Sequence, residues 1–141
     1  MELPYNKIIE EDCLGGLMVC TYYLSGDPDY DLKLTEDDFY LHRNKLVFTA
    51  ILQLHKQGME PWENNVKDEL QRMGKLAWVG GREFIHHLIY CALSRPGFRG
   101  FDPFYTAPIL RSLKLRRDAL IKAQTMAHAA LDFSRPMQVE S

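Results

Sequence analysis

Residues 106–133 read TAPILRSLKLRRDALIKAQTMAHAALDF and decide the fold class of this 141-residue chain. Leu113, Leu120 and Ala127 repeat every seven residues, with other apolar side chains beside them. This repeat is typical of a helix with one apolar face. We therefore expect one helix over 106–133, about 42 Å long, with Thr106 as N-cap and Pro108 in its first turn. The apolar face is long for a small domain, so one end should project and need a partner helix.

Helical spacing of apolar residues continues towards the N-terminus, and no segment has the alternation of a strand. Asn6 can cap a first helix, and further helices are expected at about 42–57, 64–73 and 82–93. The sequence thus predicts an all-α fold. A compact head of about five helices spans 1–103, a long stalk helix spans 104–133, and 134–141 form a disordered tail or the start of a linker.

Gly15 and Gly16 lie inside the first predicted helix. A glycine there costs about 1 kcal/mol relative to alanine. The pair predicts either close packing of a second backbone or a local kink.

Charge is unevenly distributed along a chain whose net charge is −2. Residues 1–38 carry a net charge of −8, while 39–102 and 103–133 each carry +3. Such polarity favours contacts between proteins over dedicated nucleic-acid binding, which usually needs a basic domain. No apolar run is long enough to span a membrane, and three cysteines without a C-x-x-C pair favour a reducing, cytoplasmic location.

Sequence motifs of catalysis are missing, including the phosphate loop of ATPases, G-x-S-x-G and H-E-x-x-H. We therefore expect no catalytic residue, no cofactor and no metal site. His86 and His87 are adjacent and should point to different helix faces, one half-exposed and one packed. His42, His55 and His128 are expected on the surface.

Two other clusters have simple structural interpretations. Glu36, Asp37 and Asp38 follow Thr35 and are expected to favour the positive end of a helix dipole. The three cysteines lie in apolar patterns and are expected to be buried as small hydrophobic residues; they are Cys13, Cys20 and Cys91.

A basic run on the long predicted helix could contact phosphates, or could be a solvated face opposite the apolar one. Its members are Arg111, Lys114, Arg116, Arg117 and Lys122. Any DNA contact by this domain is expected to be weak, with Arg111, Lys114 and Arg116 as its residues.

Several short motifs, in order along residues 4–133, resemble the N-terminal domain of DnaB-type replicative helicases. Pro4, Glu10, Leu14 and Gly15 are similar to the opening "P…E…LG" helix of that family. Three further stretches resemble its "DFY…IF", "L…GG..YL..L" and "IVR…R..I" segments: Asp38-Phe39-Tyr40 with Phe48; Leu76, Gly80-Gly81, Phe84 and Leu88; and Ile109-Leu110-Arg111 with Arg117.

The resemblance implies a non-catalytic domain with a helical head and stalk. In the family these domains pair and form a collar on a hexameric helicase ring, the collar docks primase, and the ATPase motor is a separate C-terminal domain. The parent protein would then be an ATP-dependent DNA helicase. The residues expected to contact a partner, or else to be buried within the monomer, are Phe84, Ile109, Leu113, Arg117, Leu120 and Met126.

The chain departs from the family pattern in places. Glu60-Pro61-Trp62-Glu63 replaces the family's "PVD", so Glu63 or Asn64 should cap the third long helix. The loop after Pro96 is about two residues longer, and only the first helix of the family's C-terminal hairpin is visible. Alternative interpretations are the related helicase-binding domain of primase, a stand-alone helical loader or DNA-binding protein, and an enzyme that uses His86 or His87.

Overall fold

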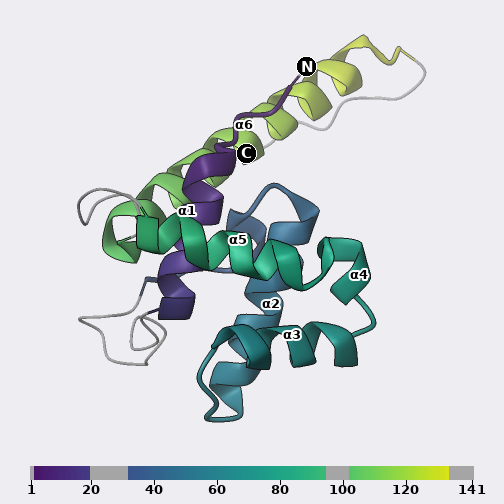
Figure 1. Cartoon of the computed structure of the whole chain (residues 1–141). Coiled ribbons are helices and arrows are strands. Elements are labelled where there is room, and N and C mark those ends of the chain that lie inside the picture. The colour runs from purple at the N-terminus through teal and green to yellow at the C-terminus, as the bar shows by residue number, and fades with distance from the viewer. Residues whose placement is uncertain (1, 20–31, 95–101, 134–141) are drawn as a thin grey trace.

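The computed structural model describes residues 2–19, 32–94 and 102–133. All regular elements within these ranges are helical: α1 (Lys7–Val19), the 3-10 helix η2 (Glu36–Asp38), α2 (His42–Lys56), α3 (Glu63–Arg72), α4 (Leu76–Val79), α5 (Gly81–Ser94) and α6 (Pro103–Leu131). Helices α1 to α5 gather into a head, and α6 extends away from it (Figure 1). The predicted all-α class with a long C-terminal helix is confirmed. None of the described helices has the length and apolarity to cross a membrane.

Helices α1 and α2 are joined by one buried carboxylate. Asn6 caps α1 as expected, since its Oδ1 accepts a hydrogen bond from the Ile9 N–H at 3.1 Å. One turn later, the fully buried Glu10 accepts hydrogen bonds from the Tyr40 and Leu41 N–H groups (2.8 and 3.3 Å) and from Asn44 Nδ2 (2.9 Å). The N-cap of α2 is Leu41, whose side chain has no acceptor. Glu10 therefore supplies the negative charge and the acceptors that the start of α2 needs.

Helices α1 and α5 pack together without a side chain at their closest point. A Cβ added to Gly15 would lie 2.1 Å from the carbonyl oxygen of Leu88 and 3.0 Å from the Cβ of Ala92. Close backbone packing is thus the reason for a glycine at position 15, as one of the two sequence interpretations predicted.

The hydrophobic core of the head lies between α1, α2 and α5. Phe39 and Phe48 are fully buried, with ring centroids 4.9 Å apart. The apolar stripe predicted on α2 faces this core: Val47, Ala50, Ile51 and Leu54 are buried and Leu46 is partly buried. Leu110 of α6 belongs to the same cluster, so the first part of the long helix is built into the head.

The start of the long helix differs from the prediction. Helix α6 begins at Pro103, and its N-cap is Asp102, whose Oδ1 accepts a hydrogen bond from the Phe104 N–H at 3.0 Å. Thr106, the expected cap, is buried within the helix and donates its hydroxyl to the Asp102 carbonyl at 3.3 Å. Proline has no backbone N–H, and the first residue of a helix does not need one. Asp102-Pro103 is therefore a stronger helix start than Thr106. Pro108 therefore lies inside α6 rather than in its first turn.

Two further helix predictions need correction. Neither Glu63 nor Asn64 caps α3: the N-cap residue is Trp62, without a side-chain cap bond, and Asn65 Nδ2 donates to the Glu60 carbonyl at 2.8 Å. The short helix α4 was not predicted; it ends at Gly80, whose φ of 113° favours glycine.

Surface residues of the head follow the predictions in part. His42, His55 and His128 are exposed and Cys13 is buried, as expected. Cys91 is only half-buried, and His86 and His87 are both exposed, because the α5 face that carries them lies at the edge of the head. The predictions for Cys20, the loop after Pro96 and the tail 134–141 lie outside the described residues.

Candidate interaction surface on the long helix

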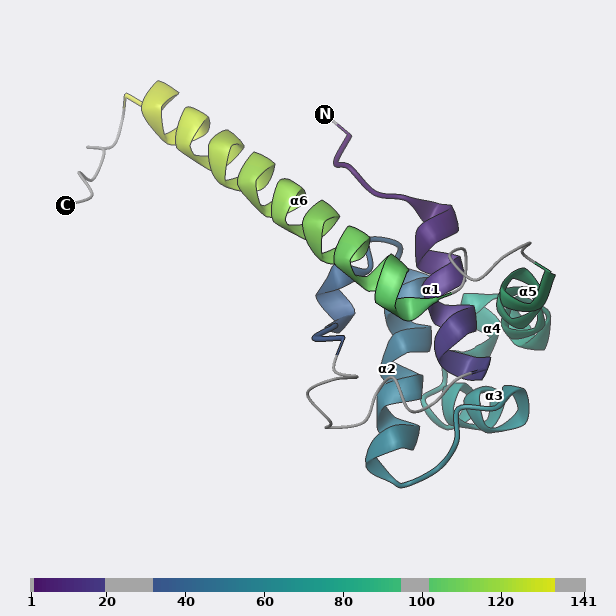
Figure 2. The ribbon, with the colours of Figure 1, turned by 90° about the vertical axis from the view of Figure 1, so that its left-hand side faces the viewer.

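Helix α6 changes its surroundings midway along its length. Its first part packs against α1 and η2, with Thr106, Ala107 and Leu110 buried. Beyond Arg117 no described side chain of α6 is buried, and only Leu120 and Gln124 are half-buried. Figure 2 shows this second part extending away from the head. The projecting end that the sequence predicts is therefore present, and we call Ala119–Leu131 the distal half of α6.

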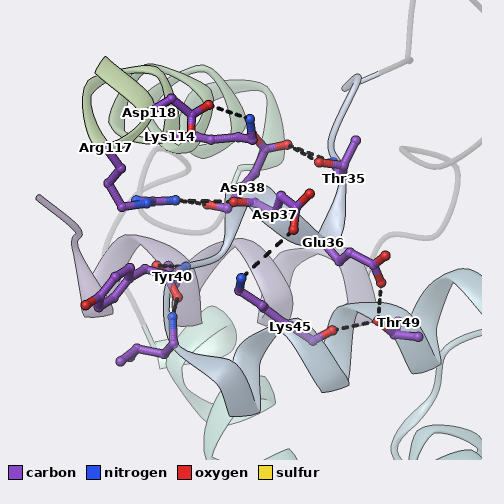
Figure 3. Close-up of polar contacts among 12 residues, drawn as sticks. Thr35, Glu36, Asp37, Asp38, Tyr40, Lys45, Thr49, Lys114, Arg117 and Asp118 are labelled. Atoms are coloured by element: carbon purple, nitrogen blue, oxygen red, sulfur yellow. Dashed lines mark hydrogen bonds and ion pairs between the residues drawn. The ribbon is translucent and has the colours of Figure 1, made fainter. Parts of the chain in front are cut away.

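Arg117 fixes the point where α6 leaves the head. Its guanidinium is only 5% exposed and donates hydrogen bonds to the carbonyl oxygens of Pro4 (3.0 Å), Asp37 and Asp38 (both 3.3 Å). It also lies 5.4 Å from the centroid of the Tyr40 ring. Figure 3 shows this arrangement between α6, η2 and the extended N-terminal segment. A buried cation surrounded by carbonyl dipoles is well paired, so Arg117 holds three segments in place.

Acidic residues of η2 are used in structure, as the sequence interpretation expected. The Asp38 carboxylate accepts hydrogen bonds from the N–H (2.7 Å) and hydroxyl (3.3 Å) of Thr35, which closes the start of η2. Glu36 accepts a hydrogen bond from the Thr49 hydroxyl at 2.8 Å, which links η2 to α2 (Figure 3). These two carboxylates thus hold η2 in place, and the first part of α6 packs against η2.

A groove of about 280 Å³ opens beside Arg117. In it, Lys114 Nζ donates to the Asp118 carboxylate at 2.7 Å, and this hydrogen bond and charge raise the pKa of the Lys114 ammonium. The other lining residues are Leu3, Asp37, Tyr40, Lys45, Arg117 and Ile121. Most of the charged side chains that line the groove are paired with other groups of this chain. We therefore interpret the groove as the place where α6 leaves the head rather than as a reactive site.

Apolar side chains lie on more than one side of the projecting part. Leu113, Leu120 and Ala127, which are seven residues apart, continue the line of α6 that faces the head, because Leu113 and Leu120 each follow a buried residue, Leu110 or Arg117, by three positions. The large exposed apolar side chains of α6 beyond Leu113 are Leu115 (69% exposed), Ile121 (48%), Met126 (49%) and Leu131 (72%). The distal half contains no carboxylate or thiol, only Lys122 and His128 as basic groups. Its exposed surface is therefore largely apolar, which is typical of an interaction surface.

The residues predicted to contact a partner divide into two sets. Met126 is exposed, and Ile109, Leu113 and Leu120 are half-buried, so these four offer surface. Phe84 is 7% exposed in the core of the head, and Arg117 is held as described above. Both are used within the chain, so the candidate surface does not include them. Leu115 and Ile121 were not predicted, because the seven-residue repeat of apolar residues identifies only one face of the helix.

Two of the three residues predicted to contact DNA already bind other groups of this chain. Arg111 donates a hydrogen bond to the Leu32 carbonyl, and Lys114 pairs with Asp118. Arg116 is exposed. Of the basic run, Arg111 and Arg117 hold α6 against the head, whereas Lys114 pairs within α6 and Arg116 and Lys122 are exposed.

Comparison with known proteins places these features in a family. Residues 2–98 match the family model described as the DnaB-like helicase N terminal domain. The solved N-terminal domain of DnaB helicase from Mycobacterium tuberculosis is similar over 94% of this chain and 91% of that chain, with a TM-score of 0.77 and 26% identity. Because so little of the chain is left uncovered, this structural similarity includes most of α6.

Curated relatives match over part of the chain. The replicative DNA helicase DnaB of Leifsonia xyli subsp. xyli is 33% identical over 87 residues, and that of Mycobacterium leprae is 34% identical over 88 residues. These alignments cover 60% and 61% of this chain, but only 18% and 14% of the relatives. The match is therefore to one end of much longer helicases and includes no catalytic domain.

Proposed function

This chain belongs to the DnaB-like helicase N-terminal domain family, and from that premise we propose that it is a non-catalytic assembly module of a replicative DNA helicase. One observation carries the proposal: the distal half of α6 exposes large apolar side chains beyond the last contact with the head. In this proposal, a second copy of the domain covers that surface, and pairs of domains form the collar of a hexameric ring.

The energy of such pairing is set by apolar area. Covering the exposed part of a Leu, Ile or Met side chain is worth about 1–2 kcal/mol. The large exposed apolar side chains of the distal half are Ile121, Met126 and Leu131, so covering them on two copies would give about 6–12 kcal/mol, which is comparable to the cost of association, about 4–15 kcal/mol. A micromolar Kd corresponds to a net free energy of about −8 kcal/mol, so pairing of the isolated domain in that range, as we propose, needs further contacts along the apolar face of α6, and the ring would add further interfaces.

Primase docking is the second part of the proposal and rests on the family resemblance. A helix or helical hairpin of primase could lie against the same kind of apolar face. Contact with DNA is proposed to be weak, since Arg111 and Lys114 already bind groups of this chain. The parent protein is proposed to carry the ATPase motor, so a phosphate-loop motif in the reading frame after residue 141 is expected.

Sedimentation velocity over a dilution series tests the pairing. The wild-type chain should shift from monomer to dimer or larger species between about 1 and 100 µM. Met126→Glu should weaken self-association at least tenfold, because it places a charge on the exposed apolar surface. Circular dichroism should show an unchanged helical spectrum, since Met126 has no contact with the core.

A matched control is Trp62→Glu, which adds the same charge at a large exposed side chain of the head. This variant should associate like the wild type. A wild-type chain that stays monomeric at 100 µM would contradict the proposal, as would equal losses in the two variants.

A further inference from the structure

Three side chains of metal-binding type meet at the edge of the α1–α5 contact. They are Glu11 from α1 and His87 and Cys91 from α5. One ligand atom from each lies within 4.8 Å of the other two. His87 and Cys91 are four residues apart, so one helix presents both on the same side. The contact at Gly15 brings Glu11 to them from the other helix.

Two of the three distances between the donor atoms match those around a zinc ion, and the third, between Glu11 and Cys91, is within 4.8 Å. In tetrahedral coordination with bonds of about 2.0–2.1 Å to nitrogen or oxygen and about 2.3 Å to sulfur, neighbouring ligand atoms lie about 3.3–3.6 Å apart. His87 Nε2 is 3.3 Å from Glu11 Oε1, and Cys91 Sγ is 3.5 Å from His87 Nε2. Cys91 Sγ is also 3.9 Å from His87 Nδ1, so it lies against the imidazole ring, and the ring would turn for Nε2 to point at an ion shared with the thiolate.

The environment of Glu11 is a second, independent argument for a cation-binding role. Glu11 is only 6% exposed, and its buried Oε2 has no hydrogen-bond partner among the described residues. Arg43 Nη2 lies 3.8 Å from that oxygen, too far for a hydrogen bond, while its guanidinium lies 4.1 Å from the centroid of the Phe84 ring. A buried carboxylate with an unsatisfied oxygen is costly unless a charge compensates it. The nearby imidazole and thiol face the same carboxylate.

We propose that Glu11, His87 and Cys91 bind a divalent transition-metal ion, with zinc as the preferred occupant. A carboxylate, an imidazole and a thiolate are all zinc ligands, and a water molecule would complete the tetrahedron. The ion would join α1 to α5 at their closest approach and would stabilise the head. The proposal goes beyond the assembly function, because α5 and the distal half of α6 lie in different parts of the molecule (Figure 2).

Cobalt and zinc titrations of the reduced full chain test the proposal. Co²⁺ should bind at one ion per chain and give a thiolate-to-cobalt charge-transfer band in the near ultraviolet, with visible bands typical of a tetrahedral ion. Zn²⁺ should displace it and raise the melting temperature. Cys91→Ser should lose the charge-transfer band. His87→Gln and Glu11→Gln should weaken Zn²⁺ binding by about tenfold or more.

His86→Gln is the matched control, because His86 is the next residue on α5 and pairs instead with Glu63 at 3.1 Å. It should bind metal like the wild type. Since Glu11 is buried, its variant could fail to fold; His87 is half exposed, so His87→Gln decides the question in a folded chain. A charge-transfer band that persists in Cys91→Ser would overturn the proposal. So would no Co²⁺ binding at 100 µM, or an equal loss of affinity in His86→Gln.

Discussion

The head and the distal half of α6 are built from similar apolar residues in opposite surroundings. In the head, Leu14, Phe48 and Ile85 are fully buried, and buried polar groups such as Glu10 are hydrogen-bonded. In the distal half, Ile121 and Met126 are about half exposed, and no second layer of this chain covers them among the described residues. The head can therefore account for its own stability, whereas the distal half, in our proposal, is stabilised by a neighbour. Substitutions should separate these two roles.

The largest effect is expected at the α1–α5 contact. Gly15→Ala places a methyl group against the Leu88 carbonyl, which is backbone and cannot turn aside. We expect the free energy of unfolding to fall by about 3 kcal/mol or more, measured by urea denaturation. Gly58→Ala is the control: its φ is +72° but nothing lies within 4 Å of the added Cβ, so the loss should be about 1 kcal/mol. Equal losses would show that glycine flexibility, and not close packing, matters at position 15.

The junction between the two regions should respond less strongly. Arg117→Met removes a buried guanidinium and leaves three carbonyl oxygens without their donor. The expected loss is about 2–3 kcal/mol of unfolding free energy. Arg116→Met, one residue away and exposed, should change stability by less than about 0.5 kcal/mol. If both variants unfold at the same denaturant concentration, Arg117 is not the anchor of α6.

The smallest effect is expected from Cys13 at alkaline pH. Burial raises the pKa of this thiol from 9.0 to about 12 in the folded chain. The unfolded chain therefore loses the proton first, so the contribution of Cys13 to stability is intact below pH 9 and is lost between about pH 9 and pH 12. Between pH 8 and pH 10 the wild type should lose about 1 kcal/mol more than Cys13→Ala. Parallel stability profiles of the two proteins would contradict the burial of the thiol.

Features that depend on local spacing could be predicted from the sequence. The apolar period of α2 placed Val47 and Ile51 in the core, and the excess apolar surface of 106–133 indicated a projecting end. The start of α6 was missed because two prolines compete for the first turn, and the Asp102-Pro103 pair was assigned to a loop. Local sequence patterns therefore predict where helices lie and which of their faces are buried, but they do not always predict the residue at which a helix begins.

Features that depend on long-range contacts were beyond the sequence pattern. The burial of Phe84 and Arg117 follows from packing between segments that are distant along the chain. The cluster of Glu11, His87 and Cys91 needs the α1–α5 contact, which joins residues 76 positions apart. The spacing of four residues between His87 and Cys91 would have predicted that these two side chains lie on the same face of a helix. The prediction considered only the adjacent pair His86-His87.

Amide hydrogen exchange at low and high protein concentration tests the central claim most directly. If the distal half of α6 is the surface that a second copy covers, peptides from residues 119–131 should gain protection between about 1 and 100 µM protein. Peptides from α2 and α3 in the head should exchange at the same rate at both concentrations. Protection that rises only in the head, or nowhere in the chain, would contradict the account.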